Sequence, residues 1–167
     1  LYAGILSKRE NKNHKKELRK NNYEEIDLVI VNFYPFEQTL KSTKNHNNHI
    51  ENIDIGGPTL VRAAAKNYKY TTVITSPHQY REFILDLKKN KGTTSLELRK
   101  KLSQEAFNLT AYYDSVISEY LNIKNNIHFP QKQTIHGNLI EVLRYGENPH
   151  QQSAIYSKHD NLGISQL

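Results

Sequence analysis

Four side chains in the first half of the sequence have the chemistry for proton transfer: Asn32, Tyr34, Asp54 and Lys66. An amide, a phenol, a carboxylate and an amine could together form an acid–base set, in which lysine and tyrosine exchange protons and aspartate orients or tunes them. The residue types leave a structural interpretation open as well. Tyr34 could pack among its aromatic neighbours, Asp54 could cap a turn, and Lys66 could be a solvated helix residue.

The elements that would position these side chains are a strand and a helix joined by glycines. Residues 26–32 form a nearly continuous apolar run, which predicts a strand covered on both faces, as in parallel sheets. Gly56 and Gly57 predict a tight turn into a helix over 59–67, with Pro58 suited to the first helical position. Ligands of open α/β sheets bind beyond the carboxyl ends of the strands. The strand end and the glycine turn are therefore the predicted site.

Later segments add a second strand and two helices. Residues 71–75 predict a short strand, and Ser76 begins a capping-box pattern before a helix over 80–87. Gly92 ends that helix, and an apolar stripe at helical spacing predicts a long helix over 98–120. Strands that alternate with helices predict an α/β fold with a mainly parallel sheet.

The last part of the sequence differs in character from the rest. Residues 122–126 end the long helix, and we place a domain boundary near 126–132. Beyond it, Gly137 and Asn138 predict a turn between two possible strands. The polar, turn-rich segment 144–152 resembles nothing earlier in the chain.

Composition bounds the class of protein. The 167 residues carry a net charge of +6, contain no cysteine, and include no apolar run near the roughly 18 residues of a membrane span. Neither a membrane protein nor a disulfide scaffold is predicted, and a cytosolic setting follows. Basic residues gather in 8–16 and 88–91, which we interpret as solvated helix faces. A basic module for nucleic acid or another polyanion stays open as an alternative, although charge alone is weak evidence.

His46 and His49 have the spacing of two metal ligands on a helix. Their surroundings over 37–51 are rich in asparagine, and no carboxylate-rich segment accompanies them. No metal site is therefore predicted.

Four motifs are specific in combination: VNFYPF over 31–36, ENIDIGGPTLVRAAAKNY over 51–68, AFNLTAYYDSVISEYL over 106–121 and LRYGENPHQ over 143–151. Together and in this order, they resemble the family of bifunctional enzymes that join IMP cyclohydrolase to AICAR transformylase.

The resemblance implies two domains, neither of them complete. Residues 1–128 would form a methylglyoxal-synthase-like α/β domain, the cyclohydrolase, without its N-terminal part. Residues 129–167 would be a linker and the start of a second α/β domain, the transformylase. Methionine is absent and both ends of the sequence look cut. We therefore expect a fragment with little or no activity by itself, and a non-catalytic remnant stays open as an alternative.

The resemblance also implies roles for single residues. Lys66 would be the main proton donor or acceptor, supported by Asp54 and Tyr34. The residues implied to hold the base and the carboxamide of the substrate are Val31, Asn32, Asp54, Ile55 and Gly56. In the transformylase part, Arg144 and Tyr145 match residues that contact AICAR.

The implied reactions are the last two steps of IMP synthesis. A formyl group passes from 10-formyltetrahydrofolate to AICAR, and the carboxamide nitrogen of formyl-AICAR then attacks the formyl carbon with loss of water. The resemblance implies no cofactor for ring closure. Holding the two groups together favours the intramolecular attack. The resemblance further implies nucleotide substrates, a homodimer as the full-length protein, and a cytoplasmic location without nucleic-acid or membrane partners.

Overall fold

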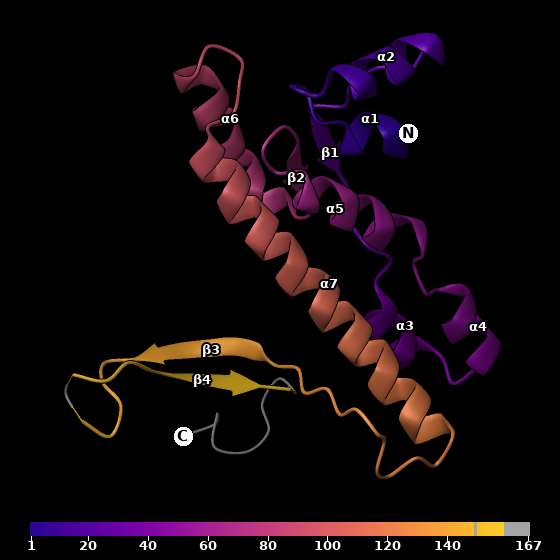
Figure 1. Ribbon diagram of the computed structural model, residues 1–167. Helices are drawn as coiled ribbons and strands as arrows, with labels where there is room; N and C mark the ends of the chain where they lie inside the picture. Colours follow the sequence, from indigo (N-terminus) through magenta and orange to yellow (C-terminus); the bar gives the residue numbers. More distant parts are fainter. Residues whose placement is uncertain (149, 159–167) are drawn as a thin grey trace. The chain divides into compact units, whose positions relative to one another are not determined.

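The computed structural model describes residues 1–148 and 150–158 (Figure 1). The chain divides into two compact units, Leu1–Ala111 and Tyr112–Leu167. The division falls inside the long helix α7 (Leu96–Lys124).

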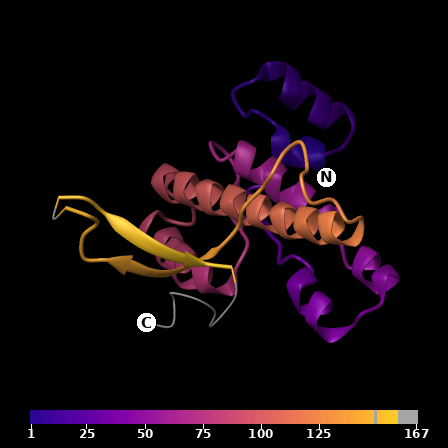
Figure 2. The ribbon, with the colours of Figure 1, turned by 90° about the horizontal axis from the view of Figure 1, so that it is seen from below.

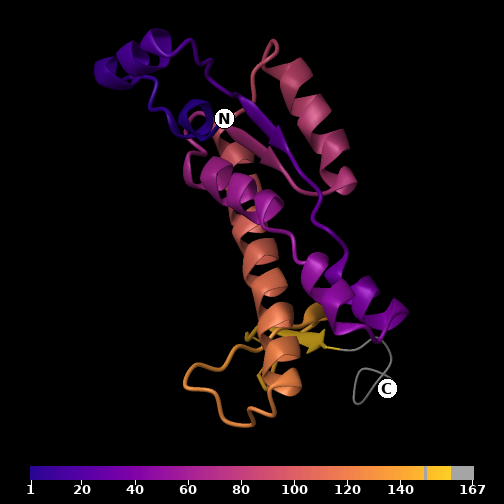
Figure 3. The same ribbon diagram turned by 90° about the vertical axis from the view of Figure 1, so that its right-hand side faces the viewer.

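The first unit is built on a short parallel sheet. Strands β1 (Leu28–Ile30) and β2 (Thr72–Ile74) pair in parallel. In Figures 1 and 3, helices α5 (Gly56–Lys66) and α6 (Tyr80–Lys89) lie on opposite sides of this pair. The predicted parallel sheet between flanking helices is thus confirmed.

The two strands differ in how far they are covered. Strand β2 is buried along its whole length, and Val73 and Ile74 are almost inaccessible. In β1 the central Val29 is buried, whereas Leu28 and Ile30 are exposed, Ile30 to 48%. The prediction that the first strand is covered on both faces is therefore wrong for β1. Within the described residues, the face that carries Leu28 and Ile30 lacks the apolar cover that a parallel strand normally receives.

Helix α5 packs its alanine-rich face onto the sheet, and the first part of α7 completes the core. The buried residues of this cluster are Ile5, Val29, Val61, Ala63, Ala64, Ala65, Val73, Ile74, Leu98, Leu102 and Ala106. The hydroxyl of Ser103 donates a hydrogen bond of 2.7 Å to the backbone carbonyl of Ala65, so that α7 is fixed at the C-terminal end of α5.

Helix α5 begins earlier than predicted. Gly56 and Gly57 are its first two residues, so Pro58 occupies the third helical position and not the first. Among the described glycines, the one with a positive φ is Gly92, at +89°, after the end of α6. Gly56 and Gly57 therefore belong to the helix, and the predicted turn at these two residues is wrong.

The N-terminal segment is attached to the core by two buried polar side chains, Asn67 and Thr71, both of which bond the carbonyl of Ile5. It contains helices α1 (Tyr2–Leu6) and α2 (Lys12–Lys20). The side-chain amide of Asn67 donates to the carbonyl oxygens of Ile5 and Ser7, at 2.7 and 3.0 Å. Asn67 stands directly after the last residue of α5, so this amide ties the end of α1 to the end of α5.

A pair of short helices follows β1. Helices α3 (Phe36–Ser42) and α4 (His46–Glu51) lie side by side (Figures 1 and 2). His49 is buried, and its Nε2 lies 2.8 Å from the carbonyl oxygen of Thr43. The predicted absence of a metal site stays a prediction; in the described part of the chain, metal-ligating side chains form no group of three or more.

Local signals define the rest of the first unit as predicted. Ser76 forms a capping box over the 3-10 turn η1 (Pro77–Gln79), which leads directly into α6. Ser95 begins α7, since its Oγ accepts the backbone N–H of Leu98 at 3.2 Å. No helix in the described ranges combines the length and the apolar character that a membrane crossing requires.

The second unit contains a β-hairpin. Strands β3 (Asn138–Leu143) and β4 (Ser153–Ser157) pair antiparallel, with an irregularity between Leu139 and Glu141. The predicted turn at Gly137 and Asn138 is wrong, because Asn138 begins β3 and the chain reverses later. The domain boundary near 126–132 falls in the segment between α7 and β3 and stays a prediction.

His136 connects the segment before β3 to the second half of α7. Its Nδ1 lies 3.1 Å from Ser115 Oγ, and its Nε2 lies 3.6 Å from a carboxylate oxygen of Glu119. The imidazole also meets the ring of Tyr112 edge to face, with 5.2 Å between ring centres. Glu119 forms a further ion pair with Lys158, just after β4. These contacts hold the hairpin on its own stretch of helix.

Candidate active site

Asp54 joins the end of β1 to the start of α5. One carboxylate oxygen accepts the backbone N–H of Gly57 at 2.8 Å, and the other accepts the backbone N–H of Tyr34 at 3.2 Å. A carboxylate at this position satisfies an N–H group that the helix cannot pair internally, and it interacts favourably with the positive end of the helix dipole. The structural interpretation of Asp54 as a cap is therefore confirmed, and the cap also fixes the backbone of Tyr34.

This link leaves polar and backbone groups exposed along the edge where β1 ends. The side chain of Asn32 is exposed, Tyr34 is exposed to 57% and Ile55 to 71%. Val31 is half-buried and still belongs to the sheet, because its N–H donates to the carbonyl of Ile74 at 3.0 Å. The predicted binding residues on these two segments thus share one accessible edge.

The two glycines at the start of α5 have different surroundings. A Cβ built at Gly56 meets nothing within 4 Å, so the backbone is open to a ligand there. A Cβ at Gly57 would lie 2.5 Å from the Asp54 carboxylate, far inside contact distance. Gly57 is therefore required by the cap, whereas the backbone at Gly56 is unobstructed.

Lys66 is the last residue of α5. At a rise of about 1.5 Å per residue, its Cα lies about 15 Å along the helix axis from that of Gly56. Lys66 is exposed. Helical periodicity nevertheless places Gly56, Thr59, Ala63 and Lys66 on one face of α5. Asn32, Tyr34 and Asp54 thus lie at the end of β1 and the start of α5, whereas Lys66 lies at the other end of this helix.

Arg62, one turn before Lys66, is held by an aromatic ring. Its guanidinium carbon lies 5.5 Å from the ring centre of Phe107 on α7. A cation over an aromatic face is attracted by the ring quadrupole. Arg62 is thus exposed and also contacts this ring, one turn before Lys66.

Arg144 and Tyr145 belong to the second unit, where they follow β3 directly. Both side chains are exposed. The loop that begins with them is closed by backbone hydrogen bonds, among them the N–H of Gly146 to the carbonyl of Gln151 at 2.9 Å. These two residues are thus accessible to a ligand of the second unit.

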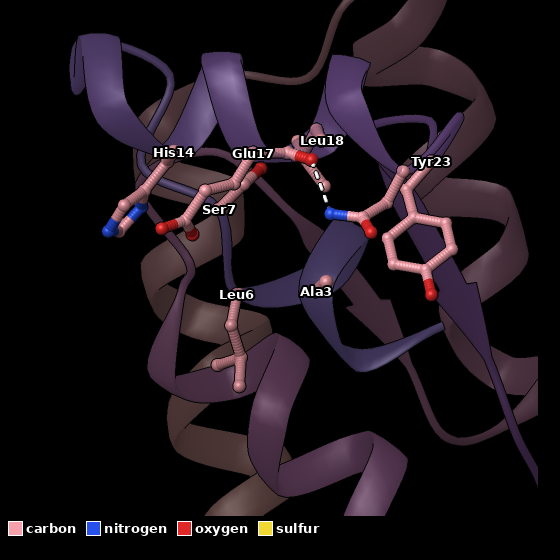
Figure 4. Close-up of a pocket in the computed structure, with 8 residues that line it drawn as sticks. Ala3, Leu6, Ser7, His14, Glu17, Leu18 and Tyr23 are labelled. Atoms are coloured by element: carbon pink, nitrogen blue, oxygen red, sulfur yellow. Dashed lines mark hydrogen bonds between the residues drawn. The ribbon is translucent and has the colours of Figure 1, made fainter.

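A cavity that the sequence did not predict lies between α1 and α2 (Figure 4). Its volume is about 240 Å³, and it is lined by Ala3, Leu6, Ser7, His14, Glu17, Leu18, Asn21 and Tyr23. The carbonyl of Leu18 accepts the N–H of Tyr23 at 2.9 Å and closes the end of α2 (Figure 4). None of the predicted site residues lines this cavity. The charged pattern of α2 gave no signal for it, because the pattern is that of a solvated helix.

Comparison with known families agrees with this architecture. The model of the MGS-like domain matches residues 3–59, which assigns the sheet edge and the cap to that class of α/β domain. The model described as AICARFT/IMPCHase bienzyme matches residues 64–167, more than half of the chain. The chain therefore belongs to the AICARFT/IMPCHase bienzyme family, and the resemblance in the sequence motifs is confirmed.

Curated relatives give the same result. The chain is 48% identical over 158 residues to the bifunctional purine biosynthesis protein PurH of Persephonella marina, an alignment that covers 93% of this chain and 30% of that protein. The PurH of Bartonella tribocorum is 42% identical over 160 residues, with 96% and 30% covered. The chain thus spans about 30% of the length of these relatives.

Among solved structures, the crystal structure of ForH is similar, with a TM-score of 0.62 and 27% identity. The match covers 72% of this chain and 62% of the ForH chain.

Proposed function

We propose that this chain is part of a bifunctional enzyme for the last two steps of IMP synthesis, formyl transfer to AICAR and ring closure of formyl-AICAR. Membership of the bienzyme family supports both activities for the whole protein. One observation carries the site within this chain: the Asp54 carboxylate holds the end of β1 against the start of α5 and leaves the Gly56 backbone open.

The proposed binding surface for the base and carboxamide of the nucleotide is this edge of the sheet. Its residues are Val31, Asn32, Asp54, Ile55 and Gly56. The exposure of Asn32 and of the Ile55–Gly56 backbone supports the assignment, because a planar base needs amide partners and unobstructed backbone.

Ring closure forms one bond and releases one water. The carboxamide nitrogen attacks the formyl carbon and loses a proton, the formamide nitrogen loses a second proton, and the formyl oxygen leaves with both as water. Lys66 is the proposed main donor or acceptor, since it lies on the same face of α5 as Gly56. The exposed phenol of Tyr34 is the second candidate, and Asp54 supports it through the backbone bond of 3.2 Å.

The remaining assignments follow from the family. Residues 1–128 would belong to the cyclohydrolase domain, and residues 129–167 would form the linker and the start of the transformylase domain. Arg144 and Tyr145 are candidates for contact with AICAR, and their exposure supports this role. In the whole protein, 10-formyltetrahydrofolate would donate the formyl group, whereas ring closure needs no cofactor. A homodimer and a cytoplasmic location belong to the same proposal.

A second function is favoured by the charge of α2. Its nine residues include five exposed basic side chains, Lys12, Lys15, Lys16, Arg19 and Lys20. Such a helix attracts polyanions. The affinity for a polyanion would fall steeply with salt and would be unaffected by the change Lys66→Ala.

The experiment that tests the proposed function is a chimera. This chain replaces the matching segment of PurH from Persephonella marina, and conversion of formyl-AICAR to IMP is followed by chromatography. We expect the chimera to close the ring, and Lys66→Ala to slow the reaction at least about 100-fold, as loss of a general acid–base group does. Lys88→Ala, an exposed lysine on α6, is the matched control and keeps the rate of the parent chimera.

An inactive but folded chimera, or an active one that tolerates Lys66→Ala, would contradict the proposal. The isolated chain is expected to give little or no IMP. Salt-sensitive RNA binding by the isolated chain, together with an inactive chimera, would favour the polyanion-binding function.

A further inference from the structure

A hydroxyl pair lies in the middle of the α5 face that connects Gly56 with Lys66. The phenol oxygen of Tyr2, on α1, is 2.7 Å from Thr59 Oγ1. Thr59 lies one turn after Gly56, and both Tyr2 and Thr59 are exposed, Tyr2 to 44%. The pair joins residues far apart in the sequence and lies next to the open backbone of the proposed site.

The hydrogen bonds of Thr59 fix the direction of the pair. A threonine hydroxyl has one proton to donate and two lone pairs to accept with. Thr59 Oγ1 lies 3.0 Å from the carbonyl oxygen of Ile55 and 2.9 Å from that of Gly56, and both of these oxygens can only accept. When the single proton of Thr59 goes to one of these carbonyls, the Tyr2 hydroxyl donates its own proton to Thr59 Oγ1. The phenol oxygen then keeps its acceptor lone pair for another partner.

The Tyr2 oxygen lies beside a stretch of α5 to which the proposed site assigns no binding residue. The predicted binding residues lie at the start of α5, Lys66 lies about 15 Å further along the same face, and Thr59 lies between them. A ligand bound at the open Gly56 backbone lies within one turn of Thr59 and meets the Tyr2 oxygen there, before the face is closed by the buried Ala63. In the part of the chain that the structure describes, the Tyr2 hydroxyl has no hydrogen bond besides the one to Thr59.

We propose that Tyr2 is a further substrate-contacting residue, whose phenol oxygen, oriented by Thr59, accepts a hydrogen bond from an N–H or O–H group of the nucleotide. The proposal rests on the proposed ring-closing function and adds a binding contact to it. Tyr2 takes no part in proton transfer, because its own proton is committed to Thr59. Its contribution is therefore to binding of the substrate.

The test uses the PurH chimera and measures KM and kcat for formyl-AICAR separately. Tyr2→Phe removes only the hydroxyl and is expected to raise KM about threefold to tenfold, the usual effect of one hydrogen bond, with kcat unchanged. Thr59→Val, which removes the orienting partner, is expected to raise KM in the same direction, and Thr59→Ser restores it. Tyr23→Phe, on another exposed tyrosine, which lines the cavity between α1 and α2, is the control and leaves KM unchanged.

The outcomes distinguish a failure of the role of Tyr2 from a failure of the proposed function. An unchanged KM in Tyr2→Phe, with an active parent chimera, overturns the role of Tyr2 and leaves the proposed function intact. An equal rise of KM in Tyr23→Phe, or a fall in kcat with constant KM, also overturns it. A folded parent chimera that forms no IMP overturns the proposed function, and this inference with it.

Discussion

Replacing Asp54 by alanine is expected to destabilise the first unit by separating β1 from α5. The change removes the acceptor of the Gly57 N–H at 2.8 Å and of the Tyr34 N–H at 3.2 Å. Loss of a helix-capping side chain costs about 0.5–2 kcal/mol, and loss of a second hydrogen bond to a charged acceptor costs a similar amount. The carboxylate also loses its interaction with the helix dipole. Together these effects predict a fall of about 2–3 kcal/mol in the free energy of unfolding.

Urea unfolding followed by circular dichroism measures this change, and amide hydrogen exchange locates it. The backbone N–H groups of Tyr34 and Gly57 are expected to exchange faster in Asp54→Ala, because both lose their acceptor. Asp54→Asn keeps one oxygen acceptor and replaces the other by an amide donor, so we expect about half of the effect. Asp114→Asn is the matched control: Asp114 is exposed on α7, and its change is expected to stay within about 0.5 kcal/mol.

The reasoning fails if Asp54→Ala unfolds within about 0.5 kcal/mol of the parent. It also fails if the exchange of the two N–H groups is unaltered, because the carboxylate would then not be their partner. A loss shared equally by Asp114→Asn would point to a general effect of charge.

Three further changes test neighbouring parts of the structure. Gly57→Ala is expected to lower the free energy of unfolding by about 1–3 kcal/mol, because its Cβ would meet the capping carboxylate at 2.5 Å. Gly56→Ala has open space around it and should raise the free energy of unfolding by about 0.5–1 kcal/mol. Equal effects of the two changes in urea unfolding would contradict this. Asn67→Ala removes a donor from the carbonyls of Ile5 and Ser7, of which Ile5 keeps the Thr71 hydroxyl, and should cost about 1–3 kcal/mol, with faster amide exchange across α1. His136→Ala should speed exchange in β3, whereas His128→Ala, on an exposed side chain, should not; equal exchange in both variants would refute the attachment.

The parts of the fold that depend on local signals were predictable. The capping box at Ser76, the end of α6 before Gly92 and the stripe of α7 are each encoded within a few residues, and all three are confirmed. The cover of β1 was not predictable, because a run of apolar residues shows what a strand can bury and not what lies against it. Ile30 has the residue type of a doubly covered strand and is nevertheless exposed.

The start of α5 shows a different limit. Two glycines before a proline are typical of a turn, and the sequence therefore predicts a turn at these residues. In the structure the Asp54 carboxylate accepts the N–H of Gly57, and the helix begins at Gly56. The same carboxylate binds the backbone of Tyr34, a contact between segments well separated in the sequence. A cap that depends on such a contact cannot be inferred from the local pattern alone. The hairpin was misplaced for a related reason, since Gly137 and Asn138 are a strong local turn signal that strand pairing overrides.

The geometry of α5 distinguishes the roles of Asp54 and Lys66, which the residue types alone did not. The Asp54 carboxylate accepts two backbone N–H bonds and is held in place by them. The Cα of Lys66 lies about 15 Å along the helix axis from that of Gly56, so Lys66 stands at the other end of α5 from this cap. In the proposed reaction, Asp54 therefore acts on the position of Tyr34 and of the helix start, and proton transfer falls to Lys66 and Tyr34. A loss of ring closure on changing Asp54 would then follow from displacement of the binding edge, whereas a loss on changing Lys66 would follow from the missing amine.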